Sequence, residues 1–207
     1  MIDKLQKELD KAARRQINGW ETLTRPGKAG GVSKKETIIH RGTMNLDHYL
    51  PLSDEVYRTP LFFVMATTNR AYILDLLPGQ SMIEFLLKQG YDIYVLDWTA
   101  PSSSEKGLDL SDYVMDFIPS CIETIRARSG EADVTMIGYC MGGVLSLIYA
   151  ALNADGPVRN LACLTTPFDW SKWGMFNKLA DPQYLDIDEI VDRLGNVPAE
   201  LIVETIN

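Results

Sequence analysis

Short apolar runs and amphipathic segments alternate along the middle of the chain. The run at 61–66 contains no polar position, which is typical of a central strand covered on both faces. Similar runs recur later, and segments with helical spacing separate them. The predicted strands lie at 61–66, 91–97, 134–137 and 160–166, and the predicted helices at 81–90, 110–126 and 144–152.

This alternation predicts an α/β fold with a doubly wound, mostly parallel sheet and right-handed crossovers. Ligands of such sheets lie beyond the carboxyl ends of the strands. Two further runs, 36–41 and 44–51, flank a turn at Gly42 and predict an antiparallel hairpin. The hairpin contains both histidines of the chain, His40 and His48.

The two ends of the chain follow other patterns. Residues 2–17 place apolar side chains at helical spacing and predict an amphipathic helix, and 24–31 predicts a turn-rich linker. From Trp170 onward we expect short helices at 186–194 and 198–206 with no strand between them, as in a cap over a site. The expected division is an N-terminal helix and linker at 1–35, an α/β core at 36–169 and the start of a helical cap at 170–207.

The stretch 134–152 predicts a strand, a sharp turn and a helix with Cys140 at the bend. In a nucleophile elbow, the residue at the bend is strained and its side chain is exposed. Strand and helix crowd each other there, and Gly138, Gly142 and Gly143 leave the necessary room. The alternative interpretation is an inert thiol in a glycine-bearing turn, since cysteine is among the most buried residue types.

Composition narrows the classes of function. The net charge of −8 argues against nucleic acid as a partner, because phosphate binding needs clustered Lys and Arg. Three cysteines without C-x-x-C spacing indicate neither a disulfide framework nor a metal site, and they favour a reducing, cytoplasmic compartment. The charged first ten residues are unlike a signal peptide, and no apolar run reaches the roughly 18 residues of a transmembrane segment.

Four stretches of the sequence form a specific set: Thr68-Asn-Arg-Ala-Tyr-Ile-Leu-Asp-Leu, Gly90-Tyr-Asp-Ile-Tyr-Val-Leu-Asp-Trp98, Gly138-Tyr-Cys-Met-Gly-Gly143 and Thr165-Thr-Pro-Phe-Asp-Trp170. Together they resemble the polyhydroxyalkanoate synthases, which are α/β-hydrolase-fold acyltransferases with a cysteine nucleophile. The resemblance covers residues 40–207 and is greatest to the smaller synthases that work with a second subunit.

The resemblance implies that Cys140 takes an (R)-3-hydroxyacyl group from coenzyme A and holds it as a thioester during polymerisation. The coenzyme A thioester is then a substrate, and no cofactor is expected. The implied partners are hydroxyacyl-coenzyme A, the growing polyester chain, a second synthase subunit or second copy of the chain, and the surface of a cytoplasmic polyester granule.

Backbone N–H groups hold the oxyanion in this fold, and we expect them to come from Met141 and from Thr68 or Asn69. The pair Asp97-Trp98 follows a strand beside the predicted site. We expect this pair to pack and hydrogen-bond the neighbouring loop rather than to take part in the chemistry.

The rest of a catalytic triad is not evident. The order in this fold is nucleophile, acid, histidine, yet no histidine follows Cys140. We expect His40 and His48 to be ordinary strand residues. Asp169 is one candidate acid, although the resemblance places the family's aspartate on a later strand. Two interpretations remain open: the chain is the N-terminal part of a longer synthase, or it is a complete protein that has lost its base.

Two functions of other classes also fit the sequence. A cysteine hydrolase or thioesterase with the same elbow would release a free acid instead of a polymer. An inactive, truncated homologue would instead bind a partner subunit or a granule surface without catalysis.

Overall fold

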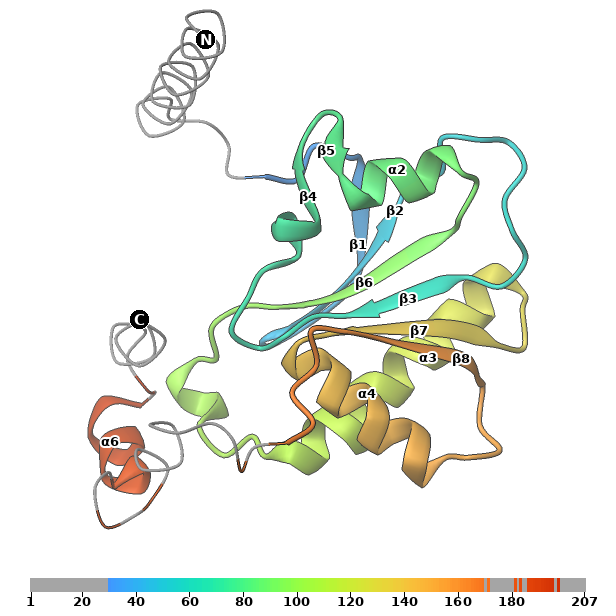
Figure 1. Ribbon diagram of the computed structural model, residues 1–207. Helices are drawn as coiled ribbons and strands as arrows, with labels where there is room; N and C mark the ends of the chain where they lie inside the picture. Colours follow the sequence, from blue (N-terminus) through green and yellow to red (C-terminus); the bar gives the residue numbers. More distant parts are fainter. Residues whose placement is uncertain are drawn as a thin grey trace, which may run out of the picture.

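A six-stranded sheet forms the centre of the computed structural model (Figure 1), which describes residues 30–169, 171, 181, 183, 186–195 and 197. The strands lie side by side in the order β1–β2–β6–β3–β7–β8. Their bounds are β1 (Lys35–Arg41), β2 (Met44–Tyr49), β3 (Leu61–Val64), β6 (Ile93–Trp98), β7 (Val134–Tyr139) and β8 (Val158–Leu164).

The four strands β6, β3, β7 and β8 run parallel, and β2 is antiparallel to both β1 and β6. The predicted α/β fold with a mostly parallel sheet is therefore confirmed. The hairpin predicted around Gly42 is also present, and this glycine has a φ of 56° in the turn. Residues of β3 and β6 are buried along the whole length of each strand, as their apolar sequences predict.

Helices cover both faces of the sheet (Figure 1). Helix α2 (Met82–Lys88) lies on one face, and α3 (Ile118–Ser129) and α4 (Met141–Leu152) lie on the other. Helix α2 begins where the side chain of Ser81 accepts the backbone N–H of Glu84 at 2.8 Å, which makes Ser81 the N-cap. Helix α6 (Ile187–Leu194) confirms the helix expected at 186–194.

The helix expected at 110–126 consists of two parts. A π-helical segment (Asp112–Phe117) leads into α3, and Pro119 stands in the first turn of α3. Proline has no N–H, so the carbonyl of Met115, four residues earlier, has no α-helical donor; Met115 lies in the π-helical segment, where a carbonyl bonds the N–H five residues on, as Tyr113 bonds Ile118. The type of helix thus changes directly before Pro119.

A small hairpin of β4 (Asp75–Leu77) and β5 (Gln80–Ser81) was not predicted. It follows a 3-10 helix at Ala71–Leu74 and precedes α2. The buried Asp75 carboxylate holds it to the core by accepting hydrogen bonds from Ser33 and Ser81. Within the described ranges, no helix is long and apolar enough to cross a membrane.

Several expectations concern residues outside the described ranges. These are the amphipathic helix at 2–17, nearly all of the linker at 24–31 and the helix at 198–206. The division into segments at 35/36 and 169/170 stays a prediction.

Candidate active site

Cys140 occupies the bend between β7 and α4 and is half-buried. Its backbone has φ 52° and ψ −120°, a region that residues with a Cβ rarely adopt. Such a conformation costs on the order of 1–3 kcal/mol and persists only where its surroundings impose it. The predicted strand, bend and helix around Cys140 therefore have the geometry of a nucleophile elbow.

The elbow glycines are surrounded too closely for any side chain. A Cβ on Gly138 would lie 2.3 Å from the Cα of Gly143, across the bend. A Cβ on Gly142 would lie 2.0 Å from the carbonyl oxygen of Val64, at the end of β3. The helix α4 thus begins in direct contact with β3, and the absence of side chains at these positions permits the bend.

The end of β8 fixes the elbow from the other side. The carbonyl oxygen of Leu164 accepts the backbone N–H of Cys140 at 2.8 Å and the hydroxyl of Thr165 at 2.8 Å. Thr165 itself has a φ of 50°, the second such value for a non-glycine residue in the described ranges. The side chain of Thr166 fills the space beside Gly143, where a Cβ would lie 1.9 Å from its hydroxyl oxygen.

Sequence reasoning did not single out Thr165 and Thr166. A β-branched residue is disfavoured at positive φ, so propensity gives no indication of such a conformation at Thr165. Their place in the last of the four stretches is the only signal in the sequence that points to them.

The loop after β3, residues 65–71, lies next to the elbow, because Val64 pairs with Gly138 in the parallel ladder. Asn69 donates its N–H to the carbonyl oxygen of Ala66 at 3.2 Å, which closes a turn. Among the described residues, the backbone N–H groups of Thr68 and Met141 donate to no acceptor. Of the two donors expected from this loop, Thr68 is therefore the one whose N–H is uncommitted.

The pair Asp97-Trp98 contacts this loop, in agreement with the expectation from the sequence. The indole N–H of Trp98 donates to the carbonyl oxygen of Met65 at 2.8 Å. Asp97 accepts the backbone N–H of Ala71 at 2.9 Å, and its other carboxylate oxygen lies 3.4 Å from Nε of Arg70.

His48 lies at the opposite edge of the sheet from Cys140. Its Nε2 is 2.7 Å from Oδ1 of Asp92, which directly precedes β6, and its ring stacks on Tyr94. Strands β6 and β7 run in the same direction, so the start of β6 and the end of β7 are one strand length apart. Six residues of strand span about 20 Å.

His40 is also distant from the elbow. It pairs with Asn45 of β2, which pairs with Asp97 of β6, so it lies near the carboxyl edge. Strands β1 and β7 are four strand spacings apart in the sheet, which is about 19 Å. The exposed ring bonds Asn45 at 2.7 Å. Both histidines are strand residues, as expected, and the structure brings neither to Cys140.

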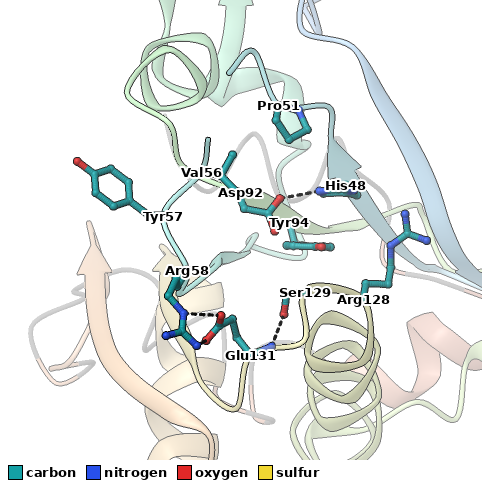
Figure 2. Close-up of a pocket in the computed structure, with 10 residues that line it drawn as sticks. All are labelled: His48, Pro51, Val56, Tyr57, Arg58, Asp92, Tyr94, Arg128, Ser129 and Glu131. Carbon is teal, nitrogen blue, oxygen red and sulfur yellow. Dashed lines mark hydrogen bonds and ion pairs between the residues drawn. The ribbon is translucent and has the colours of Figure 1, made fainter. Parts of the chain in front are cut away.

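A cleft of about 610 Å³ opens at the amino edge of the sheet, around His48 (Figure 2). Figure 2 shows Asp92 turned toward His48 and Arg58 turned toward Glu131, while Arg128 points away from Glu131. The cleft is one strand length away from Cys140, and its polar side chains bond partners within the fold. The pairs are His48 with Asp92, Arg58 with Glu131, and Arg128 with Glu36.

The three cysteines differ in environment. Cys121 on α3 is fully buried, and this burial raises the pKa of its thiol to about 12. Cys163 on β8 and Cys140 are both half-buried. Cys140 is thus more exposed than the core thiol Cys121, and both interpretations of Cys140, as a nucleophile and as an inert thiol, stay predictions.

Asp169 does not meet a histidine. Its exposed carboxylate accepts the N–H and the hydroxyl of Ser171, at 3.0 and 2.5 Å. It thereby closes a short turn directly after the loop that follows β8.

Two models of known protein families match the sequence of this chain. Residues 74–194 match the family model described as alpha/beta hydrolase fold, and residues 5–86 match the model described as the N-terminus of poly-beta-hydroxybutyrate polymerase (PhaC).

Curated relatives carry the name poly(3-hydroxyalkanoate) polymerase subunit PhaC. The protein of Haloferax mediterranei is 38% identical over 83% of this chain and 35% of its own length. The protein of Thiocystis violacea is 35% identical over 97% of this chain and 56% of its own length. The chain thus spans roughly a third to a little over half of the length of these relatives.

Solved structures share the fold at low identity. A probable hydrolytic enzyme from Pseudomonas aeruginosa PAO1 matches with a TM-score of 0.54 and 16% identity, over 87% of this chain and 54% of its own. The mature lipase BlEst2 of Bacillus licheniformis matches with a TM-score of 0.52 and 20% identity, over 78% of this chain and 60% of its own.

Proposed function

The chain belongs to the α/β-hydrolase fold family, and on that premise we propose that it carries the nucleophile of an acyltransferase that polymerises (R)-3-hydroxyacyl-coenzyme A into polyester. One observation carries the proposal: Cys140 stands at a strained elbow, and the backbone N–H groups of Met141, which follows it, and of Thr68, in the loop after β3, donate to no acceptor among the described residues. The name of these relatives, poly(3-hydroxyalkanoate) polymerase, supports the choice of reaction.

In the first step, the Cys140 thiolate attacks the carbonyl carbon of the acyl-coenzyme A. A carbon–sulfur bond forms, and the carbonyl electrons move to the oxygen, which accepts hydrogen bonds from the N–H groups of Met141 and Thr68. When the carbonyl re-forms, the bond to the sulfur of coenzyme A breaks, and coenzyme A leaves as a thiolate that takes up a proton. Exchange between two thiols is nearly isoenergetic, so the acyl group stays reactive.

In the second step, the hydroxyl oxygen of another hydroxyacyl unit attacks the Cys140 thioester. An ester bond forms, the bond to Sγ breaks, and the thiolate is regenerated. The hydroxyl gives up its proton to a base. Neither histidine of the chain is assigned to this role, since each lies about 20 Å from the elbow.

Incubation of the chain with 3-hydroxybutyryl-coenzyme A tests the proposal. We expect the peptide that contains Cys140 to gain the mass of one hydroxybutyryl group, with release of one equivalent of coenzyme A. A Cys140→Ala variant should show neither. Release of coenzyme A at an unchanged rate from a Cys140→Ser variant would contradict the thioester.

Both histidines lie far from Cys140, so the elbow has no nearby imidazole base. This observation favours a second candidate function, in which the chain is catalytically inert by itself and acts as a binding module. This candidate predicts that Cys140 is alkylated no faster than Cys163, the other half-buried thiol. A thioesterase on the same elbow is distinguished by its product, because it would release free 3-hydroxybutyrate and no polymer.

The partners form a further part of the proposal. A second synthase subunit or a second copy of the chain, together with the surface of a polyester granule in the cytoplasm, fits the likeness to the smaller synthases. Sedimentation of the purified chain with and without polyester particles measures both associations.

A further inference from the structure

We propose that Asp97 is a positioning residue that holds the loop at 65–71 in the geometry needed for oxyanion stabilisation; this inference rests on the proposed function. Asp97 is only 5% exposed and lies at the carboxyl end of β6. A buried carboxylate is stable only when hydrogen bonds or opposite charges compensate its lost hydration. Both compensating groups, Ala71 N–H and Arg70, belong to this one loop.

The loop is held at both ends by consecutive residues of β6. At its start, Met65 donates its N–H to Leu96 at 3.1 Å and accepts the indole N–H of Trp98 at 2.8 Å. At its end, Asp97 binds Ala71 and pairs with Arg70. The turn that presents the Thr68 N–H lies between these two anchors.

The start of the loop is also in contact with the elbow. A Cβ on Gly142 would lie 2.7 Å from the carbonyl oxygen of Met65, so α4 begins against the residue that Trp98 holds. The position of Met141 relative to the loop start is therefore set by close packing. The end of the loop, where Ala71 is buried in the core, is bonded by Asp97, so loss of this carboxylate should release the Thr68 donor while leaving Cys140 in place.

Asp97 is not placed to act on the substrate itself. Strand β3 separates β6 from β7, and two strand spacings are about 10 Å. Its carboxylate faces the loop, where both oxygens are engaged. Its influence on the reaction is therefore exerted through the Thr68 N–H.

Two reactions of Cys140 separate this role from a general loss of stability. Acylation by an activated thioester, phenyl thioacetate, develops an oxyanion, whereas alkylation by iodoacetamide does not. Removal of one oxyanion donor lowers rates by roughly 100- to 1000-fold. We expect acylation to fall about tenfold in Asp97→Asn and about a hundredfold in Asp97→Ala, with alkylation changed by less than about twofold.

Asp92 provides a matched control, because it lies at the other end of the same strand, is 9% exposed and binds His48 instead of the loop. Asp92→Asn should leave the ratio of acylation to alkylation unchanged. Hydrogen exchange at 66–71, which does not depend on the proposed function, should accelerate in both Asp97 variants and not in Asp92→Asn.

Each outcome decides the inference. An unchanged ratio in Asp97→Ala, or an equal fall in Asp92→Asn, overturns the positioning role, and so does unchanged hydrogen exchange of the loop. If the parent chain is alkylated but not acylated at Cys140, the proposed function fails, and the role of Asp97 in acyl transfer fails with it. Faster exchange in the Asp97 variants would then remain as a purely structural effect.

Discussion

The two edges of the sheet use their polar groups in opposite ways. At the amino edge, the polar side chains that line the cleft around His48 bond partners within the fold. At the carboxyl edge, the backbone at Cys140 is strained, and the N–H groups of Thr68 and Met141 donate to no acceptor in the described part of the chain. We expect the reaction at the carboxyl edge, because an N–H group without an acceptor can bind a developing oxyanion, whereas a group that already bonds a partner must first give that bond up.

Strand β6 runs from the amino edge to the carboxyl edge, and the acidic residues at its two ends have different kinds of partner. Asp92 at its start ties β2 to β6, and Asp97 at its end holds a loop in place. Both carboxylates are buried and bonded, yet the first stabilises the hairpin and the second bears on the site. Burial of an acid therefore does not identify a functional residue until its partners are known.

The largest expected effect concerns the thiols. If the carboxyl edge is a site, iodoacetamide should alkylate Cys140 much faster than the core thiol Cys121. Burial raises the pKa of Cys121 to about 12, so very little of this thiol is present as thiolate at neutral pH. Peptide mass mapping at pH 7–9 measures the rates. Equal rates at the two thiols would remove the contrast between the edge and the core.

A second effect concerns the stability of the elbow. A Cβ on Gly142 would lie 2.0 Å from the carbonyl oxygen of Val64. Neither atom can move away without a shift of the backbone, because the oxygen belongs to the main chain and the Cβ is attached to it. We expect Gly142→Ala to lower the free energy of unfolding by about 3 kcal/mol or more. The control is Gly107→Ala, because a Cβ there meets no atom within 4 Å. Urea unfolding of both variants measures the difference, and a similar loss in both would contradict close packing at the elbow.

The fold was predictable because its signals are local. The continuous apolar run of β3, the N-cap at Ser81 and the glycines around Cys140 each reflect a requirement of a few neighbouring residues. The hairpin β4–β5 escaped prediction because its strands have only three and two residues. Strands this short have no measurable period.

The site was predictable only in part. Cys140 and its elbow follow from spacing, and Met141 follows from the fold. The difference between Thr68 and Asn69 is that the N–H of Asn69 closes a turn, and this follows from loop conformation rather than residue type. The partners of Asp97 lie 26 and 27 positions away in sequence, and no local pattern connects them.

A smaller effect is expected at the amino edge. Asp92→Ala removes the partner of a His48 ring that is largely buried, and a buried polar group left without its partner costs about 1–3 kcal/mol. Thermal unfolding should show this loss, while the rate of Cys140 alkylation should not change. A fall in that rate would mean that the two edges are coupled, contrary to the comparison above.

The smallest effect is expected at the mouth of the same cleft. Arg58 pairs with Glu131 at 2.9 Å, but its side chain is 86% exposed (Figure 2). Water and salt screen such a pair, and ordering a long side chain offsets most of its attraction. Arg58→Ala should therefore leave the unfolding midpoint unchanged in both 0.05 M and 0.5 M salt, by the same assay that detects Asp92→Ala. A loss that is present at low salt and absent at high salt would show that the paired charges of the amino edge stabilise the fold even where they are exposed. The contribution of the amino edge to stability would then depend on how strongly salt screens its ion pairs as well as on how deeply they are buried.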